Sequence, residues 1–324
     1  MKFPLFKCIF ASIFSITCLI NHAQSADFPN RNLRIIVPVA PGATNDYLAR
    51  SLAIELGKAL GQTVIVENKP GANQIIGTSE LAKSAPDGHT MAMLISSHVI
   101  NPYIAKSLPY DSKKDFIPLA VVGIMPGLLT VHSSVPVKNF QELITYAKAN
   151  PGVLAYGQPG GLSSGHLTME YLKKEAGIDV LSVPYKGGGP ALADLLANRF
   201  QVFINSPTAT LPHIKAGTLR PLATTGNKRP EVFSDIPTIA ESGYPNIVTY
   251  EWYSLFLPAK TPPAIVNQLN AEVVKIMKSP EMQKRLLDIG AESRDYNAQQ
   301  FAQFITNESK TWGQIIQSLN IKPE

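Results

Sequence analysis

Short continuous apolar runs alternate along the chain with longer runs whose apolar residues recur every three or four positions. Residues 33–40 form the first continuous run, which predicts a buried strand, and residues 46–60 carry apolar side chains at helical spacing. The same alternation recurs through most of the sequence. It predicts an α/β fold with largely parallel sheets.

The alternation divides into two units and a helical C-terminal stretch. The first is a compact βαβαβ unit that adds strands at 63–67 and 90–95 and a helix at about 75–84. The second begins after Pro126, with strands at 128–132, 153–156, 180–184, 200–204 and 219–224 and helices at 140–149, 163–176 and 190–197. Residues 226–246 read as a turn-rich connector, and helices follow at 265–277, 281–289 and 298–319.

The C-terminal stretch has no strands of its own, so we expect it to pack on the first sheet. This organisation predicts two lobes, one of residues 26–126 plus 251–324 and one of residues 127–250. The chain would cross between them near residues 123–129 and again near 250–257. Two crossings make a hinge around a cleft, a geometry suited to closing on a ligand.

Residues 1–25 have the features of a cleavable secretory signal peptide. Lys2 and Lys7 accompany an apolar stretch at 8–20, and small residues occupy positions 23 and 25. The apolar stretch is shorter than the roughly 20 residues that a membrane span needs. No lipid-attachment pattern precedes Cys18. We therefore expect a soluble protein exported to the periplasm.

Composition narrows the chemistry further. Both cysteines, Cys8 and Cys18, lie in the predicted signal, so the mature chain would have no disulfide, thiol nucleophile or cysteine-bound zinc. Without Lys2 and Lys7 the chain has 27 basic and 24 acidic residues, a net charge of +3 with no basic run. This argues against nucleic acid as a partner and is compatible with a small anion.

Four glycine-bearing loops follow predicted strands and precede predicted helices, at residues 41–46, 70–77, 157–165 and 186–190. The first turn of a helix has unpaired N–H groups and the positive end of the helix dipole, so it accommodates an anion. Ligands of open α/β sheets also favour the carboxyl ends of strands. Two such loops per lobe would hold a carboxylate without arginine. The alternative is that each loop only turns the chain.

One enzymatic motif occurs, because residues 161–165 match the Gly-x-Ser-x-Gly elbow of serine hydrolases, with Asp194 or Asp235 as the acid and His213 as the base. An elbow directly follows its strand, whereas residues 158–161 separate Ser163 from the preceding strand. Ser163 is better interpreted as a helix N-cap whose hydroxyl and following N–H groups face a ligand. Nucleotide-binding fingerprints are absent from the sequence.

Metal and cofactor sites are not expected. The five histidines after the signal peptide are too widely spaced for a local metal site: His89, His98, His132, His166 and His213. Asp46 and Arg50 are four apart on a helix and would pair, and Lys186 would add charge to the cleft. Trp252 and Tyr253, at the second crossing, would either line the cleft or pack in the hinge.

A series of motifs runs in order along the mature chain. It consists of Val37-Pro38-Val39-Ala40-Pro41-Gly42 with Asp46 and Ala49-Arg50, Glu67-Asn68-Lys69-Pro70-Gly71-Ala72, Ala85-Pro86-Asp87-Gly88, Leu108-Pro109-Tyr110-Asp111, Val183-Pro184-Tyr185-Lys186-Gly187, Leu211-Pro212-His213-Ile214-Lys215-Ala216-Gly217 and Pro258-Ala259-Lys260-Thr261-Pro262-Pro263. Together they resemble the Bug-type extracytoplasmic solute receptors, the binding components of tripartite tricarboxylate transporters.

The resemblance implies a two-lobed type II periplasmic binding fold that closes on a small carboxylate solute for the membrane components of a transporter, without catalysis. Backbone N–H groups and hydroxyls of the facing loops would hold the carboxylate. The positions carried over are Ala43, Thr44 and Asn45 in lobe one and Ser163, Ser164 and Gly165 in lobe two, with His166 and Lys186 as secondary positions. Asp46, Gln74, Gly187 and Asn205 complete the predicted ligand-binding set. We expect a monomer, and a solute sensor for a signalling partner is an alternative role.

Two departures from the family pattern concern specificity. Asn73-Gln74-Ile75 stands where relatives often have Gly-Gly-Asn, which makes this loop bulkier. Gln201 and Asn205 stand where acidic residues are common in the family. We expect the loss of acidic charge to suit a more anionic or an uncharged distal group on the solute.

Overall fold

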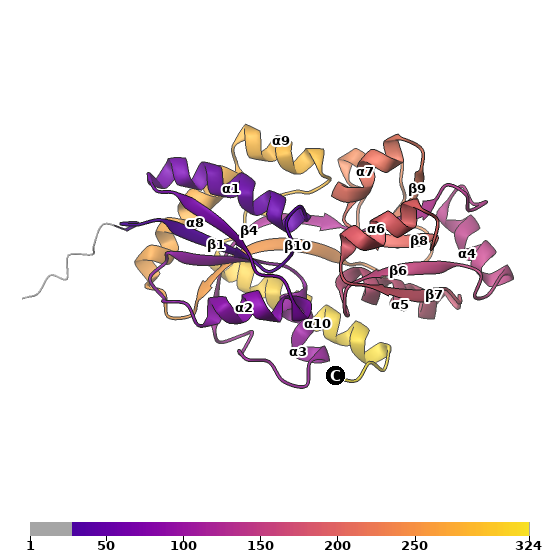
Figure 1. Ribbon diagram of the computed structural model, residues 1–324, viewed down its shortest axis with the longest axis horizontal. Helices are drawn as coiled ribbons and strands as arrows, with labels where there is room; N and C mark the ends of the chain where they lie inside the picture. The colour runs from indigo at the N-terminus through magenta and orange to yellow at the C-terminus, as the bar shows by residue number, and fades with distance from the viewer. Residues whose placement is uncertain (1–27, 324) are drawn as a thin grey trace, which may run out of the picture.

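The computed structural model describes residues 28–323, so the predicted signal peptide lies outside the described residues. Figure 1 shows two α/β bodies side by side along the long axis, with the indigo N-terminal strands and helices and the orange C-terminal ones in one body and the magenta middle of the chain in the other. No helix within residues 28–323 is long and apolar enough to cross a bilayer.

The first body, which we call lobe one, is built on a five-stranded sheet with the order β2-β1-β3-β10-β4. Its strands are β1 (Leu33–Val37), β2 (Val64–Asn68), β3 (Thr90–Leu94), β4 (Phe116–Pro126) and β10 (Tyr250–Pro258). Its helices are α1 (Thr44–Leu60), the short η1 (Ala72–Gln74), α2 (Ile75–Ala82), α3 (Ser97–Ile104), α8 (Pro263–Met277), α9 (Pro280–Asp288) and α10 (Ala298–Ser318).

The second body, lobe two, has another five-stranded sheet with the order β7-β6-β8-β5-β9. Its strands are β5 (Leu128–His132), β6 (Ala155–Pro159), β7 (Leu181–Tyr185), β8 (Val202–Asn205) and β9 (Leu219–Thr224). Its helices are α4 (Phe140–Ala149), α5 (Ser164–Ala176), α6 (Gly188–Leu196), α7 (Pro207–Lys215) and the short η2 (Glu231–Phe233). The predicted two-lobed α/β fold is confirmed.

Both sheets are mixed, so the expectation of largely parallel sheets was wrong. β1 is parallel to β2 and β3, but β10 is antiparallel to both β3 and β4. In lobe two, β6 is parallel to β7 and β8, whereas β5 is antiparallel to β8 and β9. The reversed strands are those by which the chain enters a lobe from the other one, and strand direction leaves no trace in an apolar pattern.

The segments that cross between the lobes are themselves strands. β4 ends at Pro126 and β5 begins at Leu128, and β10 pairs with β4 from Tyr250 opposite Pro126 to Pro258 opposite Phe116. The sequence placed the crossings near these positions but did not predict β4 or β10 as strands. It also missed α3 and α7, which contain prolines that disfavour a helix prediction.

Two apolar clusters cover the two faces of the lobe-one sheet. Alternate residues of β10 divide between them, so that Tyr253 packs with α1 and α8 while Trp252 packs with α3 and α10. Both aromatic side chains are buried in the core. Of the two alternatives for Trp252 and Tyr253, the structure therefore supports packing and not lining of the cleft.

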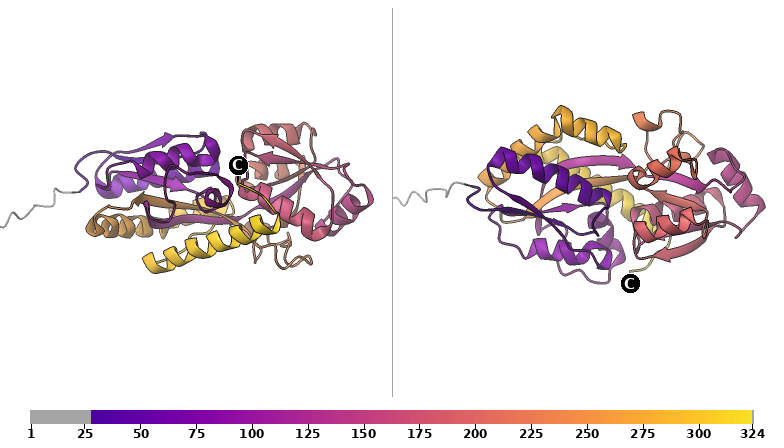
Figure 2. Two further views of the ribbon diagram at one scale, coloured as in Figure 1. Left: turned by 90° about the horizontal axis from the view of Figure 1, so that it is seen from below. Right: turned by 45° about the horizontal axis from the view of Figure 1, so that its top comes forward.

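Helix α10 lies along lobe one and reaches lobe two at its C-terminal end (Figure 2). Trp312 of α10 shares an apolar cluster with Trp252 of β10 and with Leu167 of α5 in lobe two. Lys174 of α5 also donates a hydrogen bond to the carbonyl oxygen of Ser318 at 2.5 Å. The C-terminal stretch therefore packs on lobe one, as expected, and in addition contacts lobe two.

Candidate functional site

The loops that follow β1 and β2 in lobe one, and the start of β10, contact loops and helix starts of lobe two. Thr44, at the start of α1, lies 2.9 Å from Ser206 between their hydroxyl oxygens, and Ser206 is the N-cap of α7. The backbone of Gly161 in lobe two lies against the side chain of Asn73 in lobe one. A third contact joins Ser164 of α5 to Glu251 of β10. These contacts place the predicted solute loops at the junction of the two lobes.

The N-terminus of α1 is not capped by a side chain. Its N-cap, Ala43, has extended backbone angles and offers no hydrogen-bonding side chain. The first N–H groups of a helix need a partner, and an uncapped, dipole-bearing end is suited to an anion. The Thr44 hydroxyl closes one side of this end by reaching Ser206 across the junction.

Asn45 and Asp46 use their side chains within lobe one. Asn45 donates from Nδ2 to the carbonyl oxygen of Met93 at 3.0 Å and ties α1 to β3. Asp46 accepts from the Gly42 N–H at 3.0 Å, from Asn68 Nδ2 at 3.0 Å and from the Arg50 guanidinium. Burial raises the pKa of Asp46, but the hydrogen bonds from Arg50, Gly42 and Asn68 outweigh burial and hold the pKa below its usual value. The predicted Asp46–Arg50 pair is confirmed, and Asp46 shapes the loop from within.

The second loop of lobe one is strained. Ala72, Asn73 and Gln74 all have positive φ angles, of 47°, 47° and 72°, a conformation that costs about 1–3 kcal/mol per non-glycine residue. Asn101 holds the loop, because its Nδ2 donates to the Asn73 carbonyl oxygen while its Oδ1 accepts from Asn73 Nδ2. Gln74 Oε1 is buried with no hydrogen-bond partner in the described part of the chain. Strain and an unpaired polar atom at a lobe junction are typical of a ligand site.

The loop before α5 contributes Ser163, Ser164 and Gly165 from lobe two. Ser163 is the N-cap predicted from the sequence, since its hydroxyl accepts from the His166 N–H at 3.5 Å. Ser164 donates its hydroxyl proton to Glu251 Oε2 at 2.5 Å. Gly165 lies against β8, where a Cβ atom would stand 2.5 Å from the Ile204 carbonyl oxygen. Glycine thus sets how closely the start of α5 approaches the sheet.

His166 turns its ring into lobe two. Its Nδ1 lies 3.0 Å from the Tyr156 hydroxyl, which donates to Glu170 Oε1 at 2.6 Å, and Lys173 pairs with the same carboxylate at 2.7 Å. Burial lowers the pKa of His166, so the ring is neutral near pH 7. The His166 ring thus supports the start of α5 from inside the lobe.

Lys186, Gly187 and Asn205 lie on the neighbouring loops of lobe two. Lys186 is exposed and forms no ion pair with any residue in the 28–323 range. Gly187 is the N-cap of α6, which has no side-chain cap, and Asn205 Nδ2 would stand 3.3 Å from a Cβ at Gly188. Gln201 is remote from these loops, because it bonds the Ala155 N–H at the opposite end of β6. Of Gln201 and Asn205, the two positions proposed to affect specificity, only Asn205 therefore lies near the junction.

Sequence reasoning missed Ser96, Ser206 and Glu251. Glu251 Oε1 accepts from the Ser96 N–H at 2.9 Å and from the Ser96 hydroxyl at 2.6 Å, while Oε2 accepts from Ser164. A lone acidic residue at the start of an otherwise apolar run was the only local signal for Glu251. For Ser206 the signal was its position between a strand and a proline that starts a helix.

Within the described residues the Ser163 hydroxyl forms no hydrogen bond to His213, the base of the hydrolase alternative. The hydroxyl contacts the His166 backbone, the His166 ring binds Tyr156, and Asp194 pairs with Tyr185 and Arg199. Within the described residues no group of three or more histidine, cysteine or acidic side chains could hold a metal ion.

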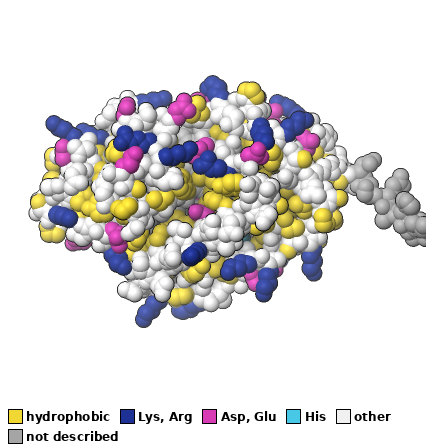
Figure 3. All heavy atoms as spheres, turned by 180° about the vertical axis from the view of Figure 1, so that it is seen from behind, with side chains coloured by type: hydrophobic (Ala, Val, Ile, Leu, Met, Phe, Trp, Pro, Cys, Tyr) yellow, Lys and Arg dark blue, Asp and Glu magenta, His cyan; other side chains and the backbone are white. Residues whose placement is uncertain are grey.

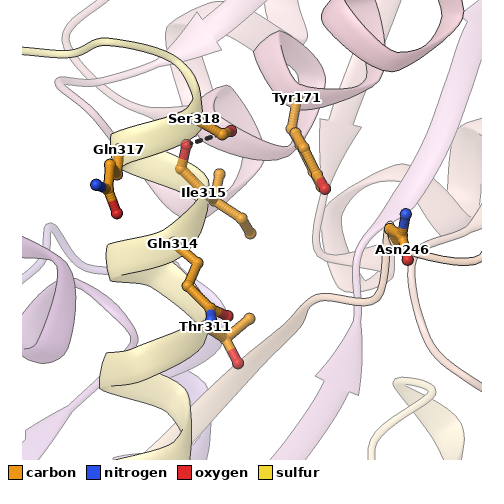
Figure 4. Close-up of a pocket in the computed structure, with 7 residues that line it drawn as sticks. All are labelled: Tyr171, Asn246, Thr311, Gln314, Ile315, Gln317 and Ser318. Carbon is orange, nitrogen blue, oxygen red and sulfur yellow. Dashed lines mark hydrogen bonds between the residues drawn. The ribbon is translucent and has the colours of Figure 1, made fainter.

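Away from these loops, a groove of about 540 Å³ follows the seam between the lobes. Figure 4 shows Thr311, Gln314, Gln317 and Ser318 of α10 on one side of the groove and Tyr171 and Asn246 of lobe two opposite. On the face seen in Figure 3, lysine and arginine side chains are scattered among acidic ones without forming one basic patch.

Comparisons with known proteins agree on one family. The family model described as tripartite tricarboxylate transporter family receptor, TctC, matches residues 48–321. The protein BugT of Bordetella pertussis is 34% identical over 313 residues, covering 96% of each chain. The R. palustris protein Rpa4515, solved with adipate, has a TM-score of 0.87 at 34% identity and covers 92% of this chain and 100% of its own. MatC from Rhodopseudomonas palustris, solved with bound malate, has a TM-score of 0.81 at 30% identity, with coverages of 89% and 100%.

Proposed function

The chain belongs to the tripartite tricarboxylate transporter receptor family, TctC, and we propose that it is a periplasmic receptor that captures a small carboxylate between its lobes. It would deliver this solute, as a monomer and without catalysis, to the membrane components of a transporter. We assign residues 26–126 plus 251–324 to one lobe and 127–250 to the other.

One observation carries the proposal. The uncapped N-terminus of α1 in lobe one and the start of α5 in lobe two both lie at the junction, where Thr44 and Ser164 bond to groups of the facing elements. Two helix N-termini present N–H groups and positive dipole ends, so they hold a carboxylate without a positively charged side chain. The adipate and malate in the two related structures are carboxylates of this kind.

In this proposal the backbone N–H groups at Thr44, Asn45, Ser164 and Gly165 bind the carboxylate. Gln74 would use its unpaired Oε1 toward the solute. Lys186 and Asn205, on the loops beside α6 and α7, would contact the distal part. An exposed lysine without an acidic partner suits an anionic distal group, and the Asn205 amide suits an uncharged one.

Thermal unfolding against a solute panel tests this function. The chain without residues 1–25 would be unfolded and refolded to remove retained ligand, then heated with mono-, di- and tricarboxylates, aromatic carboxylates and amino acids. A solute at a hundredfold excess over its Kd stabilises the folded state by about 2.7 kcal/mol and raises the midpoint. No shift with any carboxylate, or ester hydrolysis that is lost in Ser163→Ala, would contradict the proposal.

Thr44→Val is expected to weaken solute binding by about 0.5–1.5 kcal/mol, which is about a twofold to tenfold rise in Kd. The substitution removes the hydroxyl that bonds Ser206 across the junction and so destabilises the closed form. Titration calorimetry with the solute found in the panel measures the change. Thr145→Val is the matched control, because the Thr145 hydroxyl bonds only to Gln141 in its own exposed helix turn. Equal affinities of both variants would show that the Thr44 contact does not contribute to closure.

A further inference from the structure

Glu251 is a carboxyl group of the protein at the place where the two solute loops meet. It is the second residue of β10, and its two oxygens bond to different lobes. Oε1 accepts from the N–H and the hydroxyl of Ser96 in lobe one, at 2.9 and 2.6 Å. Oε2 accepts from the Ser164 hydroxyl in lobe two, at 2.5 Å. A single acidic side chain therefore joins the loop after β3 to the first residue of α5.

No lysine, arginine or histidine among residues 28–323 forms an ion pair with this carboxylate. A second acidic residue, Glu308 of α10, lies close enough for the charge of Glu251 to act on it. It too forms no ion pair in the part of the chain that the structure describes. The elements around Glu251 contribute serine hydroxyls from lobe one and α5, the acidic Glu308 from α10, and Tyr250 and Tyr253 from its own strand. Donated hydrogen bonds, from Ser164 and Ser96 among others, are what stabilise the negative charge.

The environment raises the affinity of this pair of carboxyl groups for protons. Burial raises the pKa of Glu251, although the hydrogen bonds from Ser164 and Ser96 oppose the rise. Burial also raises the pKa of Glu308 to about 7, and the charge of Glu251 adds to it. Two acidic groups that influence each other titrate as a coupled pair.

The hydrogen bond to Glu251 fixes what Ser164 can offer a solute. A serine hydroxyl has one proton and two acceptor lone pairs. Because the proton of Ser164 is donated to Glu251, the hydroxyl oxygen can only accept a hydrogen bond from the cleft. The start of α5 then combines N–H donors for a carboxylate with an acceptor next to them. A solute that carries a hydroxyl beside its carboxylate satisfies both, whereas an unsubstituted carboxylate leaves the acceptor unpaired.

We propose that Glu251 is a specificity-determining positioning residue, which makes Ser164 an acceptor and so selects carboxylates that bear a hydroxyl over their unsubstituted counterparts. This inference rests on the proposed receptor function and narrows its solute class. It also predicts that protonation of Glu251 weakens the selection. A protonated Glu251 donates its own proton to Ser164, and the Ser164 hydroxyl is then available to donate to the solute.

Glu251→Gln tests the role of the charge with little change in shape. The amide oxygen of glutamine would accept from the two Ser96 donors, and the amide N–H would donate to the Ser164 oxygen. The hydroxyl proton of Ser164 is then released toward the cleft, which reverses its polarity. Ser164→Ala is the second variant, since it removes the acceptor altogether and needs no rearrangement of Glu251.

Calorimetric titrations at pH 8 would use three pairs of solutes that differ by one hydroxyl: lactate and propionate, malate and succinate, and citrate and tricarballylate. The unmodified protein is expected to bind the hydroxylated member of the fitting pair about threefold to tenfold more tightly. Glu251→Gln should abolish or reverse this preference while still binding the pair. Ser164→Ala should abolish it as well.

A pH series separates positioning from a structural role. The preference of the unmodified protein should decline as the pH is lowered and Glu251 gains a proton, whereas in Glu251→Gln the ratio of the two affinities should change only as far as the solutes themselves titrate. Titration of the solutes themselves affects both proteins equally. Glu308→Gln removes the neighbouring negative charge and lowers the pKa of Glu251, so it should keep the preference at pH 8 and shift its decline to lower pH.

The outcomes distinguish this inference from the receptor function. Binding of a pair with the same preference in the unmodified protein and in Glu251→Gln, at every pH, would overturn the role of Glu251 and leave the receptor function standing. Absence of binding by every carboxylate would overturn both. Circular dichroism of each variant at each pH establishes that the folded proteins are compared.

Discussion

Gly165→Ala is expected to lower the free energy of unfolding by about 1–3 kcal/mol and to raise the solute Kd by at least about tenfold. A Cβ at this position would stand 2.5 Å from the carbonyl oxygen of Ile204 in β8. Both atoms belong to backbone, so no side-chain rotation relieves the overlap. The start of α5 must therefore move away from the sheet, and Ser163 and Ser164 move with it. Helix termini bind anions only where their N–H groups converge on the ligand, so this displacement should weaken binding as well as stability.

Gly189→Ala is the matched control for this prediction. Gly189 also lies in the first turn of a lobe-two helix, but a Cβ there would meet no atom within 4 Å and its φ angle is not positive. Alanine is the better helix former, so stability should stay the same or rise by up to about 1 kcal/mol. Urea unfolding and calorimetry would be run on both variants. If Gly165→Ala behaves like Gly189→Ala, then α5 does not approach β8 as closely as the structure shows.

The local pattern of apolar residues was sufficient to predict the helices and strands that bury one face. Helix α1 was predictable because Leu48, Leu52 and Leu56 recur at helical spacing and are all buried. β4 and β10 were not, because their pairing joins residues 116–126 to residues 250–258 and no local feature reports a partner so distant in sequence. The same limit explains the error in strand direction, since a buried strand has the same apolar run in either orientation.

The candidate site was likewise predictable only where a local pattern marks it. The loops at residues 41–46 and 157–165 were predictable, because glycines between a strand and a helix mark helix N-termini. The groups that connect these loops were not. Thr44 and Ser206 are 162 positions apart, and Ser164 and Glu251 are 87 apart. The positions of Asn45 and His166 in the loops were predicted, but Asn45 Nδ2 and His166 Nδ1 bond to groups of their own lobes.

The second large effect is expected from Trp312→Ala, which should cost about 3–5 kcal/mol of unfolding free energy. Trp312 is 1% exposed and lies in the cluster that joins α10 to Trp252 of lobe one and Leu167 of lobe two. The substitution removes a whole indole ring from the place where the lobes share apolar contacts. The cavity cannot collapse easily, since a strand borders it in one lobe and a helix borders it in the other.

Two variants separate the packing of Trp312 from other effects. Trp312→Phe keeps an aromatic ring in the cluster and removes less volume, so it should cost less than half of the alanine variant. Ile54→Ala on the exposed face of α1, where Ile54 is 55% exposed, should stay within about 0.5 kcal/mol of the unmodified protein. Urea unfolding followed by far-UV circular dichroism does not depend on tryptophan fluorescence.

Because the cluster includes residues of both lobes, removal of the Trp312 ring should also make the lobes unfold less cooperatively, which would be seen as a broader transition. A narrow transition with a loss below about 1 kcal/mol would show that α10 does not hold the lobes together.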